Sequence, residues 1–246
     1  MVNNFITRAI SSFFLLVVFA LLYIFKLNHF FFLVIFFLVY FELFKNKIIN
    51  LFWIIVILIV YFIFLNFFNS FNDFISTYII YVSSIYIIVL VLSFINSNIL
   101  YCKILLNIFV FNSFIFFTLL YINYFDIFFI VIFLTSINDI LAYIFGNFFK
   151  GPTIIPLISP NKTWSGTLSS YTFSVFFIIL FFDFNFIYSF LLPITFFIGD
   201  IFFSNFKRIF NFKDYGSFIR GHGGFLDRFD SSFLSLSFTF LFFIFL

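Results

Sequence analysis

The chain has 246 residues and a formal net charge of +3; 65% of its residues are hydrophobic and only 9% are charged. A soluble domain carries about a quarter charged residues, so this chain has too little charge to cover a water-facing surface. The composition excludes an ordinary soluble protein and indicates a membrane protein. The basic residues are too few and too scattered to indicate nucleic-acid binding. A single cysteine, Cys102, excludes a disulfide within the chain.

Nine apolar stretches follow one another along the chain, and a spanning helix needs about 20 such residues. Their apolarity is continuous, which is typical of helices and not of the alternating strands of a membrane β-barrel. The predicted spans are 9–25, 30–44, 48–68, 74–95, 104–123, 127–149, 167–182, 185–203 and 231–246. No small-residue cleavage site follows the first span, so we expect it to be retained. The expected fold class is all-α, a polytopic transmembrane helix bundle of about nine spans.

Positive charge gathers on one side of this layout. With the N-terminus in the cytoplasm, eleven of the twelve Lys and Arg residues lie on the cytoplasmic side and only Lys26 lies outside. The opposite loops carry Asp73, Asp126 and Asp183. Because an error of one span would scramble this alternation, the charge bias supports the predicted span count.

Two polar stretches, 150–166 and 204–230, are then cytoplasmic loops. We expect residues 1–130 to form N-terminal transmembrane helices. We expect residues 131–246 to form the catalytic transmembrane region, with the active site at the cytoplasmic face.

The sixth apolar stretch contains Asn138 and Asp139 near its middle. A carboxylate at membrane depth costs several kcal/mol unless it is paired, bound to a metal or hydrated. Asp139 is therefore a functional candidate. The alternative is a structural carboxylate that pairs with a Lys from another helix.

A second polar segment begins with Ser159 and Pro160. Ser before Pro is typical of a helix start, with Ser as the N-cap and Pro in the first helical position. A helix N-terminus with Lys162 and the Thr163 hydroxyl nearby would suit an anion such as phosphate. The alternative is a capped loop without a ligand.

The densest polar segment covers residues 199–231. Asp227 and Asp230 are three residues apart, so they project from one face of a helix, and paired carboxylates suit Mg²⁺. The glycines of 221–224 would let backbone amides approach a phosphate closely. Four cations supply charge for several phosphates: Lys207, Arg208, Lys213 and Arg228. An ordinary cytoplasmic loop would explain these cations, but not the acidic pair beside a glycine-rich turn.

These residues resemble the signature of phosphatidate cytidylyltransferases, also called CDP-diacylglycerol synthases. The shared residues are Ser204, Lys207, Arg208, Lys213, Asp214, Gly216, Gly221, His222, Gly223, Gly224, Asp227, Arg228 and Asp230. Upstream, the resemblance extends in the same order to Asp139, Ala142, Tyr143, Gly146, Ser159, Pro160, Lys162, Thr163, Trp164 and Gly166. It covers about residues 138–231. The sequence departs from the pattern at Ile140, Leu141, Tyr215 and Arg220, and none of these removes a carboxylate.

The resemblance implies that CTP and phosphatidate react to give CDP-diacylglycerol and pyrophosphate, a step of phospholipid biosynthesis, at a bacterial cytoplasmic membrane. It implies that Asp200, Lys207, Arg208, Asp227 and Asp230 are catalytic. It implies Mg²⁺, with two metal sites plausible, on Asp139, Asp200, Asp227 and Asp230. Substrate contacts are expected from Ser159, Lys162, Thr163, Ser204, Lys213, Gly221, His222, Gly223, Gly224 and Arg228. His222 is expected to shape the turn and not to act as a base, because the attacking phosphate is already anionic.

Two alternatives stay open at this point. A CTP-dependent kinase of a lipid alcohol would transfer the γ-phosphate and release CDP in place of pyrophosphate. A transporter with a buried Asp139 would spread polar residues along several helices. The sequence also leaves the oligomeric state open, with a homodimer as one alternative.

Overall fold

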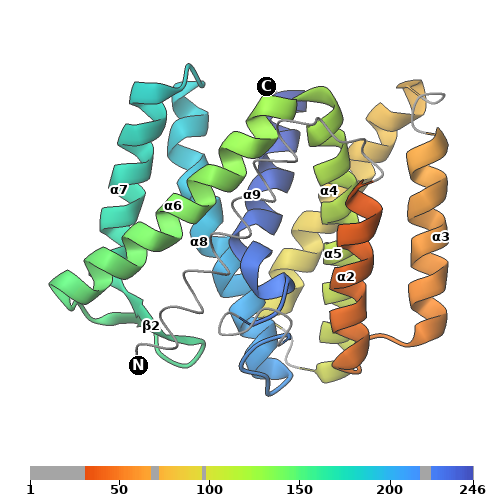
Figure 1. The fold of residues 1–246 in the computed structure, drawn as a ribbon, viewed down its shortest axis with the longest axis horizontal. Helices are drawn as coiled ribbons and strands as arrows, with labels where there is room; N and C mark the ends of the chain where they lie inside the picture. The colour runs from red at the N-terminus through yellow and green to blue at the C-terminus, as the bar shows by residue number, and fades with distance from the viewer. Residues whose placement is uncertain (1–30, 68–71, 96–97, 217–222, 246) are drawn as a thin grey trace. The chain divides into compact units, whose positions relative to one another are not determined.

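A computed structural model describes residues 31–67, 72–95, 98–216 and 223–245. Helices dominate this part of the chain (Figure 1). The helices are α2 (Phe31–Lys45), α3 (Leu51–Phe67), α4 (Asn72–Ile95), α5 (Ile99–Asn123), α6 (Phe125–Phe149), α7 (Trp164–Phe181), α8 (Phe186–Ile209) and α9 (Leu226–Phe245). Each corresponds to one predicted span. The predicted span 9–25 lies outside the described residues.

Five of these helices, α5 to α9, are long and apolar enough to cross a membrane. Two shorter apolar segments, Leu51–Asn66 and Ser83–Ile95, belong to α3 and α4. The prediction of a polytopic helical membrane protein is therefore confirmed. The count of nine spans and the cytoplasmic position of the active site stay predictions.

The polar stretch 204–230 is less of a loop than expected. Helix α8 continues to Ile209, and α9 begins at Leu226. Lys and Arg are good helix formers, so α8 extends beyond its apolar portion. As a result Ser204, Lys207 and Arg208 lie on a helix.

The polar stretch 150–166 contains a β-hairpin, so the fold is not strictly all-α. Strand β1 (Thr153–Ile155) pairs antiparallel with β2 (Ser159–Thr163). The expected helix start at Ser159 is therefore wrong. Helix α7 begins at Trp164, and the Thr163 hydroxyl caps it by accepting the Gly166 N–H at 3.2 Å.

The chain forms two compact units. The first contains Met1–Thr118 and Ile209–Phe229, and the second contains Leu119–Arg208 and Asp230–Leu246. The described residues 209–216 and 223–229 thus belong with the N-terminal helices. The expected division at residue 130 concerns function and stays a prediction.

Aromatic side chains form the core of the first unit. The Phe36 ring on α2 stacks on the Tyr61 ring of α3 at 4.4 Å between centroids. The Tyr86 ring stacks on Phe109 at the same distance, and its hydroxyl lies 3.2 Å from Ser113 Oγ. Buried Tyr hydroxyls usually find such partners. Phenylalanine side chains therefore contribute to the packing of this core.

In the second unit α6 and α7 pack closely, and the hairpin lies at their shared end (Figure 1). A Cβ atom on Gly166 would lie 2.6 Å from the Ala142 carbonyl oxygen and 3.0 Å from Gly146 Cα. Any side chain at Gly166 would push the two helices apart. Farther along, Ser174 donates to Asn138 at 3.2 Å. Small and polar contacts of this kind hold helices together in lipid, where apolar contacts give little preference.

Candidate active site

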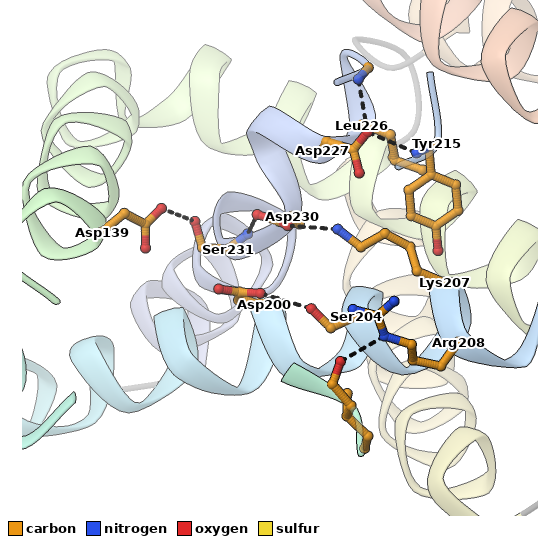
Figure 2. Close-up of polar contacts among 12 residues, drawn as sticks. Asp139, Asp200, Ser204, Lys207, Arg208, Tyr215, Leu226, Asp227, Asp230 and Ser231 are labelled. Atoms are coloured by element: carbon orange, nitrogen blue, oxygen red, sulfur yellow. Dashed lines mark hydrogen bonds and ion pairs between the residues drawn. The ribbon is translucent and has the colours of Figure 1, made fainter. Parts of the chain in front are cut away.

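Three carboxylates gather in the second unit, one from each of three helices. They are Asp139 on α6, Asp200 on α8 and Asp230 on α9. Asp139 and Asp200 are both close enough to Asp230 to repel it electrostatically, whereas Lys162 and Lys207 attract it. We call these five residues the acidic cluster. Figure 2 shows its three carboxylates and Lys207.

The contacts inside the acidic cluster are ionic. The Lys207 ammonium lies 3.7 Å from Asp230 Oδ2, and these side chains are only 13% and 14% exposed. The Lys162 ammonium, on β2, forms an ion pair with Asp200, and both side chains are 23% exposed. The ion pair therefore joins the hairpin to α8.

Hydroxyl groups supply further hydrogen bonds to the cluster. Ser204 Oγ donates to Asp200 Oδ1 at 3.1 Å, one turn along α8. Ser231 Oγ donates to Asp139 Oδ2 at 3.2 Å, linking α9 to α6. A carboxylate at membrane depth needs such partners. Ser231 was not among the predicted site residues, although its place next to Asp230 could have suggested it.

The cluster carries a formal charge of −1, from three carboxylates and two ammonium groups. Carboxylate oxygens are the hard ligands that Mg²⁺ prefers, so the donor set fits this cation chemically. In the described part of the chain, no three His, Cys, Asp or Glu side chains are yet arranged to hold a metal ion. Lys162 and Lys207 instead form ion pairs with two of the carboxylates, those of Asp200 and Asp230. Asp139, Asp200 and Asp230 are the residues of this unit that would hold a metal once those contacts open.

Asp227 lies in the first unit and has a different environment. Its Oδ2 atom accepts the backbone N–H groups of Tyr215 and Gly224, both at 2.8 Å (Figure 2). It therefore joins the stretch that follows α8 to the stretch that leads into α9. The Gly224 amide, which we expected to face a phosphate, donates to Asp227 in this structure. A metal-binding role for Asp227 stays a prediction.

The other predicted site residues are dispersed. Arg208 Nε donates to the Ile158 carbonyl at 2.9 Å and so fastens the hairpin to the end of α8. Lys213 is exposed, and Arg228 is half-buried in the first turns of α9. Ser159 lies on β2 and Thr163 caps α7, as described above. Gly221 and His222 lie outside the described residues.

Sequence reasoning missed Glu42 on α2. This side chain is only 6% exposed, and it accepts the N–H groups of Phe225 at 2.7 Å and Leu226 at 3.0 Å. One signal could have identified it, since Glu42 is the single glutamate of the sequence and stands in an apolar stretch. A carboxylate in such a place needs a partner.

Comparison with known proteins identifies the family of this chain. The sequence model of the Cytidylyltransferase family matches residues 6–246. A phosphatidate cytidylyltransferase of Rickettsia bellii is 44% identical over an alignment of 122 residues, and the match covers 43% of this chain and 52% of that protein. One of Staphylococcus saprophyticus is 42% identical over an alignment of 112 residues, and the match covers 42% of each chain. The chain thus spans about half the length of the curated relatives it matches.

Proposed function

Because the chain belongs to the Cytidylyltransferase family, we propose that it transfers the cytidylyl group of CTP to phosphatidate. The products are CDP-diacylglycerol and pyrophosphate. The similar Rickettsia and Staphylococcus proteins carry the name of this activity. The phosphatidate would enter from the bilayer and the CTP from water.

In the proposed reaction a phosphate oxygen of phosphatidate attacks the α-phosphorus of CTP. A new phosphorus–oxygen bond forms, the bond from the α-phosphorus to the bridging oxygen breaks, and pyrophosphate leaves with that electron pair. The attacking oxygen is already anionic, so no base has to remove a proton. Positioning and charge neutralisation therefore supply most of the catalysis.

The acidic cluster is the observation that carries this proposal. CTP brings about four negative charges, and two like charges about 4 Å apart repel by about 4 kcal/mol at an effective dielectric of 20. Lys162 and Lys207 would contact the phosphates, but they cannot offset both these charges and three carboxylates. A divalent cation on Asp139, Asp200 and Asp230 would neutralise charge on the reacting phosphates.

The direct test of this function is to incubate the purified protein with CTP, phosphatidate and Mg²⁺ and to identify the lipid product. CDP-diacylglycerol is the expected product. A phosphorylated lipid alcohol, formed from diacylglycerol in a parallel incubation, would favour the kinase alternative instead.

We also propose that the protein lies in a bacterial cytoplasmic membrane with segment 204–230 on the cytoplasmic face. The charge bias along the sequence supports this orientation. A cysteine replacing the exposed Lys213, in a Cys102→Ala background, should react with a membrane-impermeant maleimide only after the cells are permeabilised. A matched cysteine replacing Asp183, exposed between α7 and α8, should react in intact cells.

The pair of labelling sites makes the orientation testable in both directions. Labelling at position 213 in intact cells, with position 183 protected, would reverse the proposed topology. Labelling of both sites in intact cells would contradict the odd number of spans predicted between them.

A further inference from the structure

A side chain from a distant part of the sequence caps the N-terminus of α9. The first N–H groups of a helix have no partner within it, and Ser, Thr, Asp or Asn usually supplies one from the N-cap position. Phe225 precedes α9 and cannot do so. Glu42, 183 residues earlier in the chain, accepts the N–H groups of Phe225 and Leu226 in its place. A carboxylate there also matches the positive end of the helix dipole.

Asn46 directly follows α2, and its backbone N–H donates to the Glu42 carbonyl at 3.1 Å. Its side-chain amide donates to the Tyr215 carbonyl. Glu42 therefore binds the stretch that leads into α9, and Asn46 binds the stretch that follows α8. Asp227 joins these two stretches by accepting the N–H groups of Tyr215 and Gly224. We call Glu42 and Asn46 the α2 clamp.

Two glycines let the α2 clamp approach the backbone. A Cβ atom on Gly224 would lie 2.6 Å from Glu42 Oε2, and one on Gly216 would lie 2.7 Å from Glu42 Oε1. Real Cβ atoms do not come this close to an oxygen, so a side chain at either position would expel the carboxylate. Close packing against Glu42, in the N-terminal half of the chain, thus explains why glycine stands at these two positions.

We propose that Glu42 is a positioning residue for the proposed cytidylyl transfer: it fixes the backbone of Phe225 and Leu226 and so the first turn of α9, which carries Asp227. The functional part of this inference rests on the proposed function. The structural part does not, because it concerns which backbone amides Glu42 protects.

The test compares Glu42→Gln with Tyr40→Phe, a matched change on the same helix. Gln keeps one acceptor oxygen but presents an NH₂ group where the second N–H donates. Tyr40→Phe removes one partly buried hydrogen bond of α2, from the Tyr40 hydroxyl to the Asn107 carbonyl at 3.2 Å. It leaves the Glu42 contacts with Phe225 and Leu226 in place.

Hydrogen exchange is measured first, on the full-length protein in lipid nanodiscs. Glu42→Gln should speed exchange in peptides covering 223–229 by about tenfold or more, the effect of losing a hydrogen bond to a charged acceptor. Peptides from α7 should be unchanged in both variants, and Tyr40→Phe should leave 223–229 at the wild-type rate. Unchanged exchange at 223–229 in Glu42→Gln would overturn the inference.

Kinetics then test the functional part. Glu42→Gln should lower kcat/KM for CTP by about tenfold or more, with Tyr40→Phe near wild type. Fast exchange with normal kinetics would reduce Glu42 to a structural cap and overturn its positioning role. A wild-type protein with no cytidylyl transfer would refute the proposed function, whereas the exchange result would still decide the clamp. If Glu42→Gln does not fold, Asn46→Asp tests the contact with the stretch that follows α8. Hydrogen exchange is then measured in residues 210–216.

Discussion

Replacing Asp230 by Asn should lower kcat for CDP-diacylglycerol formation by at least about 100-fold. Asp230 interacts electrostatically with Asp139, Asp200 and two lysines. Removing its negative charge therefore changes the net charge of the acidic cluster. Losing a single preorganised electrostatic contact in an active site costs about 100-fold to 1,000-fold. Asn has nearly the same volume and keeps an oxygen that can accept the Ser231 N–H, as Asp230 Oδ1 does at 2.8 Å. The helix should therefore remain intact.

The matched control for this variant is Asp183→Asn. It makes the same chemical change at an exposed position between α7 and α8, and turnover should remain near the wild-type value. Both variants are compared for yield and thermal unfolding in detergent. An Asp230→Asn protein with turnover within twofold of wild type would remove this carboxylate from the proposed chemistry.

Removing divalent cations should have an effect at least as large. With excess EDTA, turnover should fall by about 100-fold or more, because the cluster is formally negative and its substrates are anionic. A divalent cation at such a site contributes several kcal/mol of charge stabilisation, and each 1.36 kcal/mol is tenfold in rate. Adding Mg²⁺ or Mn²⁺ in excess over the chelator should restore the rate.

A binding measurement separates this effect from damage by the chelator. Mn²⁺ binding, followed by electron paramagnetic resonance without substrates, should weaken about tenfold or more in Asp200→Asn and remain unchanged in Asp183→Asn. Full turnover in excess EDTA, with trace metals shown to be chelated, would contradict the proposed need for a divalent cation.

Much of the fold could be predicted from the sequence because lipid imposes a simple rule. Every predicted span from residue 30 onward corresponds to a helix in the structure. The limits of α8 and α9 could not be predicted from apolarity, because it reports where the membrane ends and not where a helix ends. The hairpin was missed because Ser159 followed by Pro160 also fits a helix start.

The candidate site was partly predictable for the same physical reason. Asp139, Asp200 and Asp230 stand out because carboxylates are costly in an apolar chain, and the structure brings these three together. The contacts of Lys162 and Arg208 with other segments depend on tertiary packing and could not be predicted. Glu42 was missed because its partners lie 183 residues away.

The central claim is tested most directly by following two labels of CTP in one reaction with phosphatidate. Label on the α-phosphate should appear in the lipid, and label on the γ-phosphate should appear in pyrophosphate, in equal amounts over time. Asp230→Asn should lower both together. Label from the γ-phosphate in the lipid, with CDP as the second product, would contradict cytidylyl transfer and would establish a CTP-dependent kinase instead.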